Sequence, residues 1–308
     1  MAALAIFVGC DNDNKIEDDF IHTGVFLQLG MGADTRTSIG DKNPDTGKTS
    51  FLWSKGDALG IYCAENNVNN RMVTVPSSAD GQHEARISTD LEFNGTGNHT
   101  FYFYYPYDAN QATSFTTSVT KTLSANQRGL INANGFMYQS ATTNSSAPEI
   151  TFDMKHIFSY LRFFVVDSEV ADNTVSIINV TFRNMTTESA KLAGSYTANL
   201  TNGSTSFTSG SNSIFMEPYT TMYVTKKVPE SKIGYPAMVI NPAAVKSTDT
   251  LRVIISFSDG KTAYVDVKGK TFAAQSIYNI TLKTLQQDQD FKIIVQAWDE
   301  VDCDIAFN

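Results

Sequence analysis

The chain has 308 residues and a formal net charge of −9. That charge balance excludes a nucleic-acid-binding role, because phosphate contacts need a basic surface. The length predicts two domains, since one core rarely grows beyond about 200 to 250 residues. Thr, Ser, Asn, Tyr and Phe are abundant and long runs of helix formers are missing, so the composition favours strands and turns.

The amino-terminal stretch MAALAIFVG leads directly into Cys10. Small or branched residues before a cysteine form a lipobox, where a signal peptide is removed and the cysteine is acylated. Phe7 stands where Leu is usual and no basic residues precede it, so we interpret the stretch as a truncated secretory signal. A buried amino-terminal strand is the alternative. The acidic run DNDNKIEDD that follows is typical of a solvated tether. We expect residues 1–22 to be signal and tether, with the lipid on Cys10 as the membrane contact.

The first strand is predicted in TGVFLQLGM, where a period of two places four apolar residues on one face: Val25, Leu27, Leu29 and Met31. A run rich in Gly, Asp and Thr follows, and it predicts a loop that contains Arg36 and Thr37. Further strands are expected up to Trp53, over residues 58–63 and in short segments near residues 72–76 and 85–93.

The segment FYFYYPY predicts a strand with two aromatic faces that ends at Pro106. One face carries Phe101, Phe103 and Tyr105, and the other carries Tyr102 and Tyr104. One face must fill a core. The second face either packs against another sheet, which we favour, or forms a platform on which a glycan stacks.

The polar stretch SATTNSSAPE at residues 140–149 indicates a boundary between two β-sandwiches, over residues 23–147 and 148–308. The second half shows many short strands divided by turns, which predicts antiparallel sandwiches. Its clearest hairpin has Asp259-Gly260 at the tip. Residues 155–164 could be read as a helix, but their Phe and aromatic content favours a strand. The chain ends on VDCDIAFN, where apolar residues alternate again: Val301, Cys303, Ile305 and Phe307.

The sequence contains no HExxH, GxSxG, P-loop or paired CxxC motif, and we expect neither an enzyme nor a cofactor. The four histidines, His22, His83, His99 and His156, stand outside any known ligand or triad spacing. The acidic groups at residues 11–14, 288–290 and 302–304 are interpreted as solvated carboxylates rather than metal sites. Cys63 and Cys303 are expected to be buried free thiols, with a disulfide between them as the alternative.

Several stretches taken in order resemble the fimbrillin family of Bacteroidetes, in particular the Mfa-like (minor-fimbrillin-like) proteins. They are TRT at 35–37, FLWSKGDALGIY at 51–62, YYPY at 104–107, FDMKHIFSYLRFFVV at 152–166, FAAQSIYNITL at 272–282 and QAW at 296–298. The resemblance implies two transthyretin-like sandwiches in tandem, export as an outer-membrane lipoprotein, and assembly with other subunits into type V pili. It also implies maturation by an arginine-specific protease that cuts after Arg36 and leaves Thr37 as the new amino terminus.

Loss of the first strand would expose backbone groups on two neighbouring strands and an apolar slot between them. Four buried side chains are worth roughly 6 to 12 kcal/mol at about 1.5 to 3 kcal/mol each, before ordering costs. The segment from Val301 to Phe307 has the same spacing and is our candidate donor strand. The alternative is that it stays paired within its own domain.

The resemblance therefore predicts a non-enzymatic fimbrial subunit or tip adhesin, assembled by donor-strand exchange. Its expected partners are other pilus subunits, the maturation protease and a host or bacterial surface ligand. The alternative function is a surface glycan-binding lipoprotein of a polysaccharide uptake system.

Overall fold

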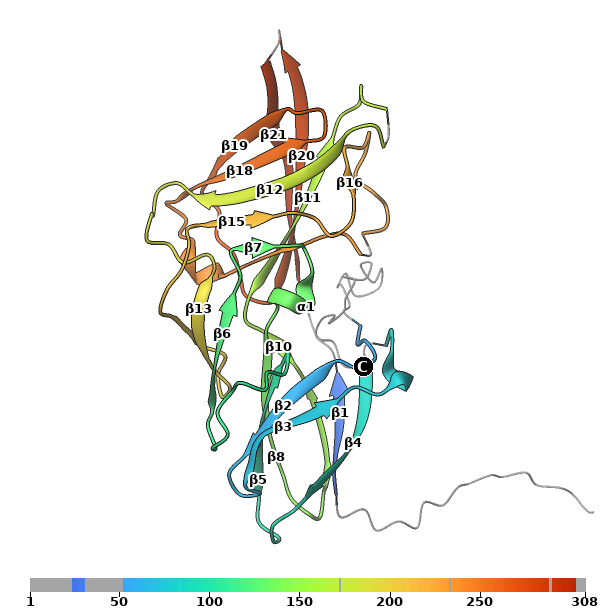
Figure 1. Ribbon diagram of the computed structural model, residues 1–308, viewed down its shortest axis with the longest axis vertical. Helices are drawn as coiled ribbons and strands as arrows, with labels where there is room; N and C mark the ends of the chain where they lie inside the picture. The colour runs from blue at the N-terminus through green and yellow to red at the C-terminus, as the bar shows by residue number, and fades with distance from the viewer. Residues whose placement is uncertain are drawn as a thin grey trace, which may run out of the picture.

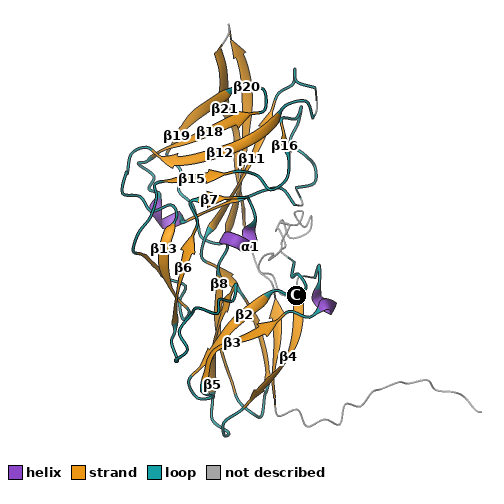
Figure 2. Cartoon of the chain, in the orientation of Figure 1, coloured by secondary structure: helices purple, strands orange, loops and turns teal. Residues whose placement is uncertain are grey.

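The computed structural model describes residues 24–30, 52–82, 84–171, 173–232, 234–287 and 290–302. Two lobes are stacked along the long axis of the molecule, and nearly every regular element is a strand (Figure 1, Figure 2). The described residues contain one short helix, α1 (Ile131–Asn134), and two 3-10 turns, at Ser77–Ala79 and Pro242–Ala244. The all-β class predicted from composition is therefore confirmed.

The strands of the first half and of the junction follow in chain order. They are β1 (Gly24–Gly30), β2 (Ala58–Cys63), β3 (Val68–Thr74), β4 (Glu84–Glu92), β5 (His99–Tyr105), β6 (Ser118–Leu123), β7 (Asn126–Gln127), β8 (Met137–Thr143), β9 (Glu149–Asp153) and β10 (Lys155–His156). The remaining strands are β11 (Ser159–Val166), β12 (Ser176–Asn184), β13 (Gly194–Asn199), β14 (Thr205–Phe207), β15 (Ser213–Met216), β16 (Met222–Tyr223), β17 (Met238–Ile240), β18 (Thr250–Phe257), β19 (Thr262–Lys268), β20 (Ser276–Gln287) and β21 (Asp290–Asp302).

The N-terminal lobe consists of two sheets with the strand orders β4-β1-β9 and β10-β8-β5-β2-β3. Their facing side chains form a buried core that includes Trp53, Ile61, Ile87, Phe103 and Ile150. Ile87 of β4 and Ile150 of β9 alternate with polar residues along their strands, the pattern of a strand with one buried face.

The C-terminal lobe consists of three sheets: β17-β11-β20-β21, β19-β18-β12-β15-β7 with β16 beside β12, and β14-β13-β6. Most neighbours are antiparallel, but β11 runs parallel to β20 and β15 runs parallel to β7. The predicted hairpin at Asp259-Gly260 is confirmed as the turn between β18 and β19, where Gly260 has a positive φ of 85°. Residues 155–164 form β10 and the start of β11, so the strand interpretation is also confirmed.

Strands on each side of the predicted domain boundary, between residues 147 and 148, pair with strands on the other side of it. β6 and β7 precede that point but pair with β13 and β15 of the C-terminal lobe, whereas β9 and β10 follow it but pair with β1 and β8 of the N-terminal lobe. The polar stretch at 140–149 contains the end of β8 and a turn in which Ala147 N–H donates to Asn144 C=O at 3.0 Å. The polar composition of this stretch indicates that the turn is exposed. It does not indicate which sheet the strands on either side of the turn will join.

The two cores meet at the sheet that contains β5. Phe101, Phe103 and Tyr105 lie in the core of the N-terminal lobe, while Tyr104 belongs to the core of the C-terminal lobe.

The predicted strand into Trp53 is wrong, because residues 52 and 53 precede β2 without joining a ladder. Trp53 is instead held by backbone hydrogen bonds to Gly81 and Gln82, and its ring is fully buried.

Candidate assembly site

Strand β1 lies between two neighbours in the N-terminal lobe. It pairs antiparallel with β4, where Leu27 is opposite Ile87, and parallel with β9, where Leu27 is opposite Ile150. Ile87 and Ile150 are both buried in the core of the lobe. Any loss of β1 would therefore leave unpaired N–H and C=O groups on two strands, beside an opened core.

The direction of a replacement strand is not dictated by this site. Because β1 runs antiparallel to β4 and parallel to β9, a strand inserted either way meets one parallel and one antiparallel neighbour. The alternation of apolar residues with a period of two is the stricter requirement, since a slip of one residue moves every side chain to the wrong face.

The predicted functional residues are only partly covered by the described part of the chain. Val25 lies in β1, at an irregularity in the β1–β4 ladder between Gly24 and Phe26, and Leu27 and Leu29 lie in regular register. Cys10, Met31, Arg36, Thr37, Cys303, Ile305 and Phe307 lie outside the described residues. Acylation, cleavage and strand donation at these positions stay predictions.

Val301 lies near the end of β21, opposite Ile277 of β20. The β20–β21 ladder extends from Ser276 opposite Asp302 to Gln287 opposite Asp290, whereas β11 pairs with β20 only as far as Lys283. The far end of this hairpin is therefore a two-stranded ribbon, and it projects at the end of the C-terminal lobe (Figure 1).

The two described histidines are buried structural groups. His99 Nε2 lies 3.2 Å from Asn94 C=O, and its ring meets Phe93 edge-on. His156 Nδ1 is hydrogen-bonded to the Tyr160 hydroxyl. Cys63 is a free, fully buried thiol, and burial raises its pKa to about 11. In the described segments, no three His, Cys, Asp or Glu side chains come together in a way that could hold a metal ion.

On the second aromatic face of β5, Tyr104 is covered by the core of the C-terminal lobe, whereas Tyr102 is half-buried against that core. The Tyr104 ring stacks at 6.2 Å on Tyr62 and at 6.3 Å on Phe136, and it is fully buried. Its hydroxyl donates to Asn70 Oδ1 at 2.5 Å and accepts from the Asp108 N–H at 3.2 Å. The sequence-based preference for inter-sheet packing over a glycan platform agrees with this arrangement at Tyr104.

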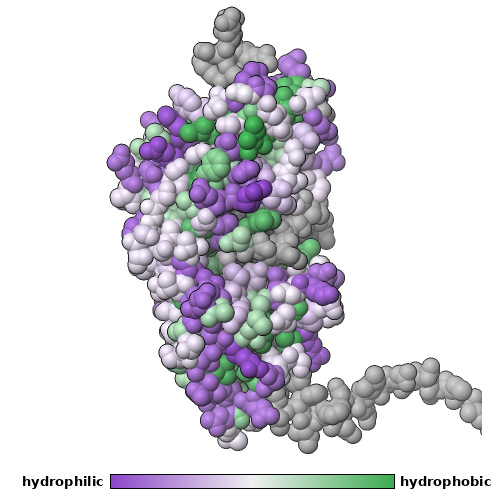
Figure 3. All heavy atoms as spheres, viewed as in Figure 1, coloured by the Kyte–Doolittle hydropathy of each residue, from purple (hydrophilic) through white to green (hydrophobic). Residues whose placement is uncertain are grey.

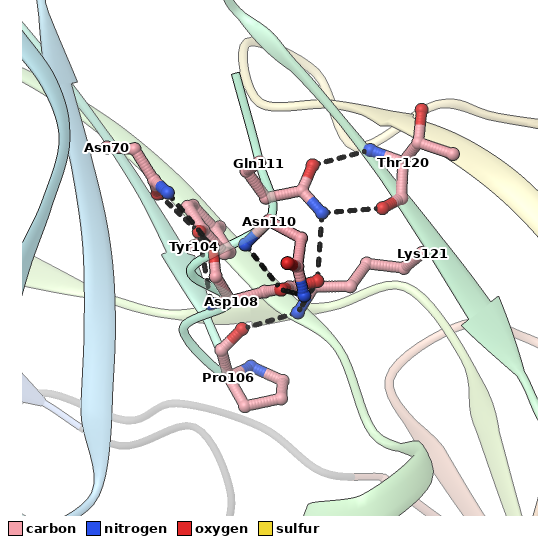
Figure 4. Close-up of polar contacts among 8 residues, drawn as sticks. All are labelled: Asn70, Tyr104, Pro106, Asp108, Asn110, Gln111, Thr120 and Lys121. Carbon is pink, nitrogen blue, oxygen red and sulfur yellow. Dashed lines mark hydrogen bonds and ion pairs between the residues drawn. The ribbon is translucent and has the colours of Figure 1, made fainter. Parts of the chain in front are cut away.

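A network of polar side chains ties the loop after β5 to strand β6 (Figure 4). Lys121 of β6 donates to Pro106 C=O at 2.9 Å and pairs with Asp108 at 3.4 Å. Burial alone would raise the pKa of Asp108, but hydrogen bonds from Asn110 and Gln111 and the charge of Lys121 lower it overall. Sequence reasoning missed this network, because no local pattern marks residues that tertiary folding brings together.

The face of the molecule seen in Figure 3 shows apolar residues in small separate groups among polar ones. Three of the exposed large side chains, Ile178, Phe215 and Tyr264, lie on the sheet β19-β18-β12-β15-β7. Arg252 lies 4.4 Å from the centre of the Tyr264 ring and forms a two-point ion pair with Asp266. No helix in the described ranges is long and apolar enough to cross a bilayer.

These features define an all-β protein of two cores, in which an early strand is held between two later ones. The chain belongs to the fimbrillin-like family, whose model matches residues 35–298. No curated protein matches it at the level of sequence. The fold is similar to that of a protein named for cell adhesion from Bacteroides uniformis, at 17% identity and a TM-score of 0.58, over 92% of this chain and 100% of the other. A second protein named for cell adhesion, from Bacteroides ovatus, has 15% identity and a TM-score of 0.56, over 92% and 99% of the two chains.

Proposed function

We propose that this protein is a non-enzymatic subunit or tip adhesin of a bacterial surface fimbria of the Bacteroidetes type. Membership of the fimbrillin-like family and the likeness to proteins named for cell adhesion support this role. The observation that best supports the assembly step is the position of β1 between β4 and β9. Removal of β1 would leave unpaired backbone N–H and C=O groups on both of these strands at once.

The proposed sequence of events begins with export and acylation at Cys10. An arginine-specific protease then cuts between Arg36 and Thr37, downstream of β1, and the strand containing Val25, Leu27 and Leu29 leaves. A strand from another subunit enters the vacated groove and restores the ladders with β4 and β9. The segment from Val301 to Phe307 is the candidate donor, since its apolar residues recur with the same period.

Cleavage of the purified protein tests whether the groove left by β1 accepts a strand from another subunit. Treatment with an arginine-specific protease is expected to yield Thr37 as the new amino terminus and to convert monomers into oligomers on a sizing column. The matched control is Arg36→Lys, which such a protease does not cut and which should stay monomeric. Cleaved protein that stays monomeric and retains residues 24–36 in its mass spectrum after sizing would overturn the proposal.

A pair of substitutions tests whether the carboxy-terminal segment is the strand that is donated. Ile305→Asp places a charge on the apolar face of the candidate donor strand, whereas Ala306→Asp places it on the opposite face. We expect both variants to melt like the parent, and only Ile305→Asp to block oligomer formation after cleavage. If Ile305→Asp lowers the melting temperature of the uncut monomer by several degrees, the segment belongs to its own fold and the donor hypothesis fails.

The alternative of a glycan-binding lipoprotein is less well supported, because Tyr104 on the second face of β5 is buried. A purified protein that resists the protease and binds polysaccharides on a glycan array would favour that alternative.

A further inference from the structure

Strand β6 forms one edge of the sheet β14-β13-β6. The backbone N–H and C=O groups of every second residue in β6 therefore point away from β13, toward the free edge of the sheet. Thr117 C=O accepts from Leu200 N–H at 2.8 Å, so odd-numbered residues face the paired side. Both backbone groups of Thr120 bond instead to the Gln111 side chain, so even-numbered residues face the free edge.

Side chains cap this free edge at three positions. The Thr116 hydroxyl bonds both backbone groups of Ser118, at 3.1 and 3.2 Å. The Gln111 amide accepts from Thr120 N–H at 3.0 Å and donates to Thr120 C=O at 2.7 Å. Gln127 Nε2 donates to Ser124 C=O at 2.9 Å. Such caps keep an edge strand from pairing with other chains.

Thr122 is the exception on this edge. Its backbone N–H and C=O face the free edge, and neither has a hydrogen-bond partner there among the residues that the structure describes. A cavity of about 370 Å³ opens beside it, with Lys121, Asp108, Asn134, Phe136 and Tyr196 in its lining. That volume lies in the range of about 300 to 1,000 Å³ typical of ligand pockets.

The charged groups of this cavity are already engaged. Lys121 is bonded to Pro106 C=O and paired with Asp108, whose carboxylate also accepts from Asn110 N–H and Gln111 Nε2. The ligand that fits is therefore uncharged. It must also offer an acceptor and a donor spaced to match one strand residue.

Groups of this kind already occupy equivalent positions twice in the fold. The Gln111 amide satisfies both groups of Thr120, and the Gln127 amide satisfies both groups of Val239, at 2.8 Å each. Between chains, the same pair of hydrogen bonds is made by one residue of an extended peptide, as in strand addition.

We propose that the Thr122 cavity binds a short, uncharged, extended segment of a partner protein. One residue of the segment pairs with Thr122, and a flanking side chain enters the cavity toward Phe136 and Tyr196, because side chains alternate across a strand. The caps at Thr120 and Ser124 limit the paired stretch to about three residues, since strand hydrogen bonds recur at every second residue. This site is separate from the β1 groove and does not depend on strand exchange.

The test uses the uncut chain with β1 in place, so its failure leaves the proposed assembly untouched. Acetyl-Leu-Ala-Leu-methylamide is titrated into ¹⁵N-labelled protein, and saturable shifts are expected at the amides of Thr122, Phe136 and Tyr196. An analogue with an ester oxygen in place of the Ala N–H should bind about 5- to 10-fold more weakly, because Thr122 C=O loses its donor. Equal binding of the two ligands, or no saturable shift, would overturn the proposal.

Two variants at one position sharpen the test. Thr122→Pro removes the free N–H at an edge position that tolerates proline, whereas Thr122→Val retains it. We expect binding to be lost in Thr122→Pro and retained in Thr122→Val, and undiminished binding by Thr122→Pro would overturn the proposal. If Thr122→Pro does not fold, the ester comparison on the parent protein decides. Saturation by N-acetylglucosamine without peptide binding would also overturn it and indicate a saccharide site.

Discussion

At the scale of single residues, the contact between Gly60 and Tyr104 shows how tightly the junction of the two lobes is packed. The two residues lie opposite each other in β2 and β5. A Cβ atom on Gly60 would lie 2.0 Å from Tyr104 Cε1. The ring cannot easily move away, because it stacks on Tyr62 and Phe136 and its hydroxyl is hydrogen-bonded. A glycine in the middle of a strand is weakening in general, so close approach of the ring accounts for its presence here.

Gly60→Ala is therefore expected to lower the free energy of unfolding by about 1 to 3 kcal/mol, the usual cost of overpacking. Gly97→Ala is the control, since no atom lies within 4 Å of its added Cβ and its φ is ordinary. The control should change stability by less than about 0.5 kcal/mol. Urea unfolding measures both, and a Gly60→Ala variant as stable as the parent would mean that the Tyr104 ring moves freely.

At the scale of elements, β1 matters because it has neighbours on both sides. Gln28 lies in the centre of the strand, opposite Arg86 of β4 and Thr151 of β9. Gln28→Pro removes a backbone donor and leaves one acceptor on a neighbour unsatisfied. Gln28→Ala keeps the donor and serves as the matched control.

We expect Gln28→Pro to destabilise the protein by about 1 to 3 kcal/mol, the cost of an unsatisfied buried group. Amide hydrogen exchange should rise in β4 and β9, while the sheet β17-β11-β20-β21 keeps its protection. Unchanged exchange in both neighbours would show that β1 contributes little to the N-terminal lobe, which would also weaken the proposed role of its removal.

At the scale of the whole molecule, the two lobes share one sheet. Tyr62, Tyr104 and Tyr138 belong to the core of the C-terminal lobe although they come from strands of the N-terminal lobe. Separation of the lobes would expose these rings to water, at about 25 cal/mol for each Å² of apolar surface. The lobes should therefore unfold together.

The two tryptophans allow this coupling to be measured. Trp53 lies in the core of the N-terminal lobe, and Trp298 lies in β21 of the C-terminal lobe. The variants Trp298→Phe and Trp53→Phe leave one reporter each. We expect the urea midpoint seen by fluorescence to coincide with that seen by circular dichroism in each variant. Two separate transitions in either variant would contradict the coupling.

The sequence by itself determined the all-β class, the strand character of residues 155–164 and the hairpin at Asp259-Gly260. These features follow from local alternation and turn chemistry, which need no distant partner. The family resemblance could also be read there, from TRT at 35–37 to QAW at 296–298.

Only the tertiary structure decided that β1 lies between β4 and β9, that Tyr104 is covered by Phe136, and that the edge of β6 is open at Thr122. A period of two specifies which side chains share a face, but it does not specify which strands become neighbours. Those neighbours are set by hydrogen bonds and packing between segments that are far apart in the chain.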